Sequence, residues 1–153
     1  MATTRRAEAV PRALHVAEPP ATWGLRRTAV VDASLMAALL FAEPEQPLAA
    51  RKMAECQPAA PDLLPYELGN VALSKLRQGQ AEAAVRASLA ELDALGVALH
   101  PVAPTAALDV AARYALTAYD AAYLALAAQL HCPLLTFDQR LAAAARQYFD
   151  SSA

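Results

Sequence analysis

Short, mostly apolar stretches alternate along this chain with longer segments rich in alanine. The apolar stretches read TAVVD at 28–32, VALHPV at 97–102 and PLLTF at 133–137. Strands that are apolar on both sides leave no face for solvent, which is typical of a parallel sheet covered by helices on both faces. The alternation therefore predicts an α/β fold in which strands and helices follow one another along the chain.

The segments between these stretches have the composition and the stop signals of helices. Alanine favours helix, and Gly79 and Gly96 follow two of the segments as C-terminal stops. Asp62 is expected to cap the helix that ends before Gly79. The sequence leaves open whether a further strand lies near 57–61 or after Tyr148. We expect helices over about 33–41, 48–56, 62–78, 81–95, 105–115, 117–130 and 138–148.

Charge and proline content divide the 153 residues into two parts. Residues 1–27 carry five arginines against two glutamates, a charge of +3, and contain three prolines but no apolar period. We expect a flexible basic N-terminal arm there and one domain over 28–150. Since the net charge is −2, the part after residue 27 carries −5. An acidic body favours nucleic acid as a partner only where something else, such as a metal ion, supplies positive charge.

Several classes of protein are disfavoured by what the sequence lacks. Hydrophobic residues make up 57%, but no apolar run approaches the roughly 20 residues of a membrane span, and the first residues do not resemble a secretory signal. Cys56 and Cys132 lack the spacing of zinc ligands, and the four glycines form no phosphate-binding loop. We expect idle thiols in a reducing cytoplasm and no contact with a membrane.

Four carboxylates lie in separate stretches, each beside strongly apolar sequence. An acidic side chain is costly to place next to a core unless its charge is compensated. Four converging carboxylates would repel one another, and a divalent cation is the simplest compensation. Oxygen ligands without histidine suit Mg²⁺ or Mn²⁺ better than zinc. The residues of this candidate metal site are Asp32, Glu67, Asp120 and Asp138.

A simpler role is open to each aspartate. Asp32 and Asp138 precede expected helices and can cap them, and Asp120 with Thr117 resembles a capping box. Capping and metal binding are compatible, because the start of a helix stabilises negative charge. Glu67 fits a capping role worst, since it lies inside an expected helix.

Three polar residues lie within three positions of an acid: Ser34, Asn70 and Thr136. They are expected either to hydrogen-bond to the acids or to serve as ordinary caps and surface groups. The three histidines form no spaced cluster, so they are not expected to bind metal.

Four segments carry a resemblance to a known family: VVDASLMAALL, PDLLPYELGNVALSK, LTAYDAAYLALAAQL and PLLTFDQRLAAAA. In this order they resemble PIN-domain nucleases, in particular VapC-like toxins of toxin–antitoxin pairs. The resemblance covers about 28–148, and its most specific part is YDAAYLALA together with LLTFD. It implies a three-layer α/β/α sandwich with a central parallel sheet, and it makes 28–150 a nuclease domain.

The resemblance also implies an activity and partners. It implies a Mg²⁺- or Mn²⁺-dependent endoribonuclease that leaves 5′-phosphate and 3′-hydroxyl ends. The four carboxylates would be its catalytic acids and metal ligands, with Thr136 and Asn70 matching supporting positions of the family. The expected partners are an RNA substrate, a second copy in a homodimer, and a small antitoxin that covers the acidic site.

Other classes of protein could also place acids in this way, and the sequence fits them to different degrees. A haloacid-dehalogenase-type phosphatase needs a second aspartate two residues after Asp32, where Ser34 stands. A phospho-receiver domain needs a late lysine, and no lysine follows Lys75. A non-catalytic PIN-fold binding module would be expected to lose some of the four acids. That module and a housekeeping RNA-processing nuclease remain the alternatives.

Overall fold

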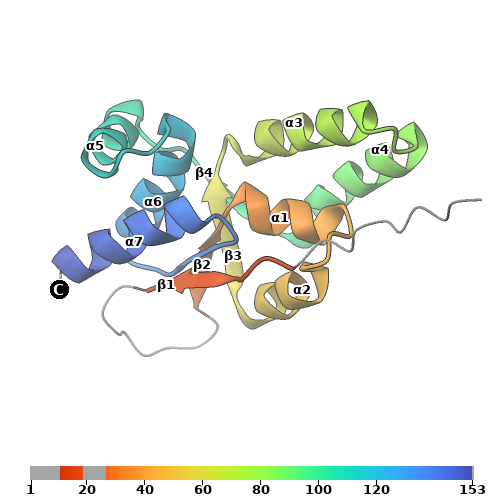
Figure 1. The fold of residues 1–153 in the computed structure, drawn as a ribbon. Helices are drawn as coiled ribbons and strands as arrows, with labels where there is room; N and C mark the ends of the chain where they lie inside the picture. The colour runs from red at the N-terminus through yellow and green to blue at the C-terminus, as the bar shows by residue number, and fades with distance from the viewer. Residues whose placement is uncertain (1–10, 19–26, 153) are drawn as a thin grey trace, which may run out of the picture.

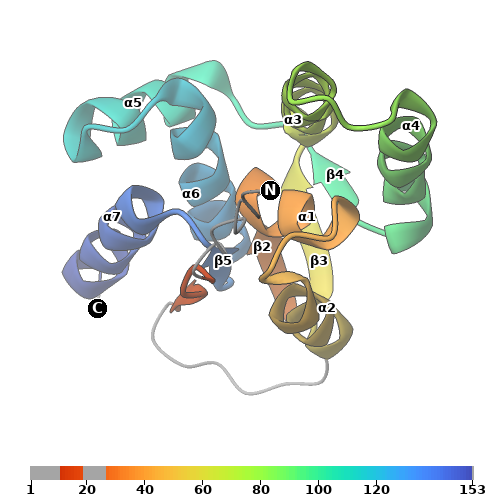
Figure 2. The ribbon, with the colours of Figure 1, turned by 45° about the vertical axis from the view of Figure 1, so that its right-hand side comes forward.

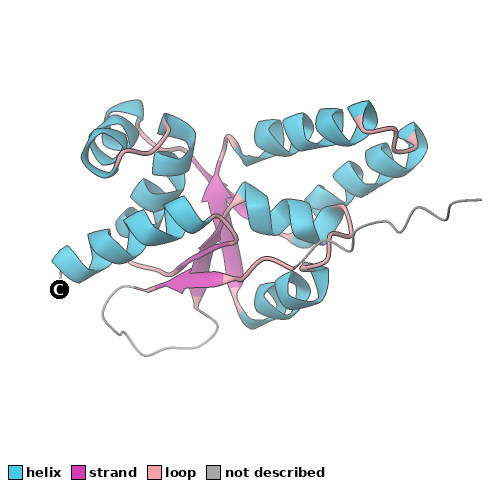
Figure 3. Ribbon diagram, in the orientation of Figure 1, coloured by secondary structure: helices cyan, strands magenta, loops and turns pink. Residues whose placement is uncertain are grey.

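The computed structural model describes residues 11–18 and 27–152, which build a five-stranded sheet between layers of helices (Figure 1, Figure 3). The strand order is β1-β5-β2-β3-β4. β2 pairs in parallel with β3 and β5, β3 pairs in parallel with β4, and β1 is antiparallel to β5. The strands are β1 (His15–Ala17), β2 (Thr28–Val31), β3 (Gln57–Pro61), β4 (Ala98–His100) and β5 (Leu134–Thr136).

Helices cover both faces of this sheet, which confirms the expected three-layer α/β/α architecture. The helices are α1 (Ala33–Leu40), α2 (Gln46–Glu55), α3 (Leu64–Arg77), α4 (Glu82–Ala90), the 3₁₀ helix η1 (Glu91–Leu95), α5 (Pro104–Tyr114), α6 (Ala118–Leu130) and α7 (Gln139–Ser151). α6 packs on β2 and β3 from one side, and α1 and α2 lie on the other (Figure 1). α3 and α5 lie apart from each other above the sheet, and α6 runs from α5 down along the sheet (Figure 2). No helix among the described residues has the length and hydrophobicity to cross a bilayer.

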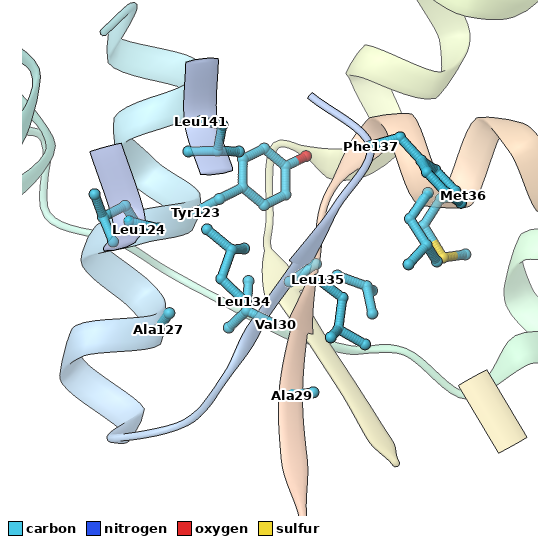
Figure 4. Close-up of a cluster of buried hydrophobic side chains, with 14 of the residues drawn as sticks. Ala29, Val30, Met36, Tyr123, Leu124, Ala127, Leu134, Leu135, Phe137 and Leu141 are labelled. Atoms are coloured by element: carbon cyan, nitrogen blue, oxygen red, sulfur yellow. The ribbon is translucent and has the colours of Figure 1, made fainter. Parts of the chain in front are cut away.

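The core lies where α6 meets the two central strands (Figure 4). Val30 of β2 and Leu134 of β5 are fully buried there against Tyr123 and Leu124 of α6. Because apolar surface removed from water stabilises a fold by about 25 cal/mol per Å², these contacts fix α6 on the sheet. The position of α6 in turn fixes Asp120 and Tyr123 relative to the strand ends.

Chain reversal beside β2 places the carboxyl ends of two strands together. From β2 the chain proceeds to β3 and β4, and it then crosses back to form β5 on the other side of β2. The register pairs Val30 with Leu134 and Val31 with Leu135, so the next residues on the two strands, Asp32 and Thr136, lie side by side. Such a reversal is where open α/β sheets bind their ligands, outside the carboxyl ends of the strands.

Helix starts are where the sequence analysis was least accurate. α2 and α5 begin before the expected positions, because Pro47 and Pro104 lie in their first turns, where a missing N–H costs little. The prediction that Asp62 caps α3 is wrong. Leu63 holds the N-cap position without a side-chain cap, and the Asp62 N–H donates to the His100 carbonyl at 2.9 Å, which extends the β3–β4 ladder. The strand that the sequence could not place is β3, at Gln57–Pro61.

A short strand that the sequence analysis did not expect forms before residue 27. β1 pairs His15 with Thr136 and Ala17 with Leu134, so it covers the free edge of β5, and Ala17 is buried. Residues 11–18 therefore belong to the folded body. The rest of the expected arm, 1–10 and 19–26, lies outside the described residues. The flexibility expected of 1–10 and 19–26 stays a prediction, as does a nuclease domain over 28–150.

A network of charges ties the segment before β1 to the body. Arg12 donates its N–H to Glu45 at 2.5 Å and its Nε to the same carboxylate at 3.0 Å, and its Nη2 reaches Glu43 at 2.6 Å. Lys75 of α3 pairs with Glu43 at 2.8 Å. The Arg12 guanidinium also lies over the Phe137 ring, 5.6 Å from its centre. The side chain of Glu45 is 4% exposed, so Arg12 supplies the charge that this buried carboxylate needs.

Arg12→Ala is expected to lower the free energy of unfolding by about 1–3 kcal/mol, because it leaves a buried carboxylate without its charged hydrogen-bond donor. Burial favours the neutral acid, yet the hydrogen bonds from Arg12 hold the pKa of Glu45 below its ordinary value. Urea unfolding at pH 7 measures the loss. Adding Glu45→Gln to Arg12→Ala removes the unpaired charge and should restore part of the stability. If Glu45→Gln lowers the free energy of unfolding as much in the Arg12→Ala protein as it does in the wild type, the two side chains are not coupled.

Candidate active site

Asp32 is held at the end of β2 by three donors. As the N-cap of α1 it accepts the Leu35 N–H at 3.0 Å, the Ser34 hydroxyl at 2.7 Å on Oδ1, and the Thr136 hydroxyl at 2.6 Å on Oδ2. The residue is only 5% exposed. The capping role expected for Asp32 is therefore real, and the hydroxyl donors expected at Ser34 and Thr136 are both in contact with this carboxylate.

The same two hydroxyls also accept hydrogen bonds from the turn between β5 and α7, so they connect that turn to Asp32. Ser34 Oγ accepts the Phe137 N–H at 2.9 Å, and Thr136 Oγ1 accepts the Asp138 N–H at 2.8 Å. Asp138 is the N-cap of α7 and accepts the Leu141 N–H at 2.9 Å. The ends of β2 and β5 thus form one hydrogen-bonded unit that carries two of the four acids.

Glu67 is held by a tyrosine that the sequence analysis missed. The Tyr123 hydroxyl donates to Glu67 Oε2, and its ring is buried in the core at 1% exposure, with the hydroxyl turned toward the carboxyl ends of the strands (Figure 4). Burial raises the pKa of Tyr123 above its ordinary value, and the Glu67 charge adds to the increase, so the phenol stays a donor. Its position three residues after Asp120, on one face of α6, was the available signal.

Asp120 and Asn70 lie at the more open part of the site. Thr117, the N-cap of α6, accepts the Asp120 N–H at 3.1 Å and donates its hydroxyl to the Asp120 carboxylate at 2.9 Å. The expected capping box is thus present in altered form, because the carboxylate bonds the threonine hydroxyl instead of a backbone N–H. Asn70 is exposed on α3 and lines one pocket with Glu67.

Electrostatic coupling joins the four carboxylates. Burial raises the pKa of Asp32 to about 6; hydrogen bonds from Thr136, Leu35 and Ser34 oppose the rise, and the nearby charge of Asp138 adds to it. Burial also raises the pKa of Glu67, with contributions from Asp120 and Asp32. Each acid therefore lies in the field of at least one other, as expected for groups that share one site.

The donor set of this site suits a hard divalent cation. Among the described residues, the ion pairs of lysine and arginine are made with Glu43, Glu45, Glu55 and Glu82, and none is made with the four site carboxylates. In residues 11–18 and 27–152, no three His, Cys, Asp or Glu side chains lie close enough together to hold a metal ion as they stand. Both carboxylate oxygens of Asp32 accept hydrogen bonds from protein donors, and Asp138 and Asp120 each accept one on a single oxygen. The residues fit Mg²⁺ in ligand type and uncompensated charge, and their role as ligands stays a prediction.

Comparison with known proteins assigns this chain to a family. The family model described as PIN domain matches residues 29–147. The chain therefore belongs to the PIN domain family.

Two similar proteins come from Pyrobaculum aerophilum. Ribonuclease VapC3 is 34% identical over 119 residues, which cover 74% of this chain and 91% of that protein. The crystal structure of PAE2754 matches with a TM-score of 0.62 at 30% identity, covering 77% of this chain and 79% of that one. The chain is thus a VapC-like member of its family, as its sequence motifs indicated.

Proposed function

We propose that this chain is a Mg²⁺- or Mn²⁺-dependent endoribonuclease and the toxin of a toxin–antitoxin pair. The observation that carries the proposal is a set of four carboxylates, each near at least one other: Asp32 and Asp138 follow β2 and β5, and Glu67 and Asp120 lie on α3 and α6. Among the described residues, no lysine or arginine forms an ion pair with them. The likeness to Ribonuclease VapC3 supports RNA as the substrate.

Asp32, Asp120 and Asp138 would hold the metal ion, with Glu67 close to it. A bound divalent ion supplies positive charge for the phosphate and lowers the pKa of water. The protein's own contribution is to keep the ligands oriented. Ser34 and Thr136 hold the orientation of the Asp32 carboxylate through hydrogen bonds, and the residue is 5% exposed.

Glu67 has the geometry of a group that orients the attacking water. Tyr123 donates to Oε2, Oε1 accepts no hydrogen bond from the described residues, and Glu67 is one of the residues that line the pocket. Oε1 can therefore accept the proton of water as the water oxygen attacks phosphorus. The bond from phosphorus to the 3′ oxygen breaks, that oxygen takes a proton from solvent and leaves as a 3′-hydroxyl, and the 5′-phosphate remains on the other product.

Two protein partners complete the proposal. A small antitoxin would cover the site, with a basic side chain that pairs with several of the carboxylates at once. A second copy of the chain would form a homodimer. The likeness to a VapC protein supports the antitoxin, and sedimentation of the purified chain alone and with its partner measures both associations.

Cleavage of single-stranded RNA by the purified protein is expected to require Mg²⁺ or Mn²⁺ and to stop when EDTA is added. The same ions should raise the free energy of unfolding by about 2.7 kcal/mol at a hundredfold excess over Kd, because they bind only the folded state. Gel analysis of a labelled RNA and thermal unfolding measure the two effects.

Asp120→Asn/Asp138→Asn is the matched control for the metal effect. The double variant should lose both the cleavage and most of the stabilisation. Equal stabilisation of wild type and variant would place the ion elsewhere. RNA binding without cleavage under any divalent ion would favour the non-catalytic binding module, and cleavage that persists in EDTA would rule out metal dependence.

A further inference from the structure

Two largely exposed tyrosines line one pocket next to the acids. Tyr66 of α3 is 80% exposed and Tyr119 of α6 is 65% exposed. Both line a pocket of about 400 Å³, together with the apolar side chains of Leu63 and Val71. Exposed aromatic side chains that gather at a concave surface commonly mark a binding site.

The pocket is continuous with the proposed catalytic centre. Glu67 lines it directly, and so does Ala33, the residue that follows Asp32. Most of the lining comes from α3 and its N-cap residue, with Tyr119 from α6 and Ala33 from α1. A group that enters between Tyr66 and Tyr119 is therefore adjacent to the carboxylates.

We propose that this pocket takes an unpaired base of the RNA substrate between Tyr66 and Tyr119. The proposal deepens the ribonuclease function and rests on it for the identity of the nucleic acid. Aromatic side chains stack with bases of any sequence, and single-stranded RNA can turn a base out to meet them. The substrate class is thus RNA with an unpaired base next to the cleaved phosphodiester bond.

The charge of the pocket selects the base over the phosphate. Its lining contains the Glu67 carboxylate and no lysine or arginine. A phosphate would be repelled there, whereas a base is neutral and carries amino and imino donors on its edge. The exposed Asn70 amide lines the pocket and can meet such an edge, and the apolar residues Leu63 and Val71 can meet its faces.

Binding of a short single-stranded RNA to the Asp32→Asn protein tests the pocket without cleavage. Tyr66→Ala and Tyr119→Ala, each added to this background, should weaken binding about 5- to 150-fold, the effect of one lost base stack. Tyr66→Phe and Tyr119→Phe should bind like the parent, because they keep the ring. Leu108→Ala, at an exposed position on α5 outside the pocket, is the matched control. Thermal unfolding checks that each variant is folded.

An abasic nucleotide gives a readout that a merely structural role of the tyrosines would not change. An abasic nucleotide at one position of the RNA should weaken binding to the Asp32→Asn parent. The same nucleotide should not weaken RNA binding further when the parent also carries Tyr66→Ala and Tyr119→Ala. Unchanged binding of both alanine variants would overturn the proposal, as would the absence of RNA binding by the parent. So would alanine variants that bind RNA normally but lose the antitoxin, since the pocket would then belong to that partner.

The outcomes separate this proposal from the nuclease function. If Tyr66→Ala and Tyr119→Ala, made in the otherwise wild-type chain, cleave RNA at the wild-type rate, the nuclease function stands and the base-binding role of the pocket is wrong. If the wild type cleaves no RNA with any divalent ion but binds RNA in a way that depends on the two tyrosines, the base-binding role of the pocket stands and the nuclease function is wrong.

Discussion

Asp32→Asn should reduce metal-dependent RNA cleavage by more than about 100-fold, since the loss of even an outer partner of a metal ligand commonly costs 10–100-fold. The substitution keeps the shape of the side chain. Its amide oxygen can still accept the Leu35 N–H, and the hydroxyls of Ser34 and Thr136 can rotate to accept from the amide nitrogen. Steady-state cleavage of a labelled RNA measures the loss.

The same variant should be more stable than wild type without metal above pH 6. The pKa of Asp32 is about 6 in the folded protein against an ordinary value of 3.8, so the folded state binds the proton more tightly than the unfolded chain. Wild-type stability therefore falls as pH rises from about 4 to 6, by up to about 3 kcal/mol. The substituted amide does not titrate, so the variant avoids this fall. Urea unfolding in EDTA at pH 4 and pH 7 measures the difference.

Asp109→Asn is the matched control for both measurements. Asp109 is an exposed carboxylate of α5, so its loss changes net charge equally but leaves the site intact. It should cleave RNA and unfold like wild type. Wild-type cleavage by Asp32→Asn would remove Asp32 from the catalytic centre. A variant that unfolds at lower urea than wild type at pH 7 would show that the carboxylate stabilises the fold, and Asp120→Asn, at a more exposed position, would then test the site.

The regular elements were predictable from sequence because their signals are local. The apolar runs before Asp32 and Asp138 end where β2 and β5 end, and the strand-end rule then places both acids at one edge of the sheet. β1 has no such signal. Its three residues become a strand only because β5 offers a free edge, and that partner lies more than 100 residues away in the chain.

The contacts of the site were less predictable, because they depend on tertiary structure. Tyr123 lies in an apolar stretch and reads as a core residue, which its ring is. Only its hydroxyl leaves the core, and its acceptor on Glu67 belongs to another helix. Arg12 likewise reads as one of several arginines in a polar segment. Its buried partner Glu45 shows no sign of burial in the sequence, since Pro44 and Pro47 around it favour a surface loop.

Expression of the wild-type chain alone in a bacterial host should arrest growth, because an uninhibited ribonuclease in the cytoplasm destroys RNA that the cell needs. Co-expression of the small protein encoded beside it should restore growth. Colony counts after induction measure both effects. Asp32→Asn should be harmless, and Asp109→Asn, the surface control, should arrest growth like wild type.

The cause of the arrest can be separated from mere overexpression by the binding of the partner. Asp32→Asn loses one of four carboxylates, so a basic side chain of the inhibitor can still pair with Glu67, Asp120 and Asp138. The harmless variant should therefore still form a complex with the neighbouring protein, and at high expression it should titrate that protein away from the wild type and restore the arrest. Active wild type that leaves growth unchanged, with no complex formed by the neighbouring protein, would reject the toxin role. The RNA cleavage would then belong to a housekeeping nuclease, whose four acids have the same chemistry but need no inhibitor.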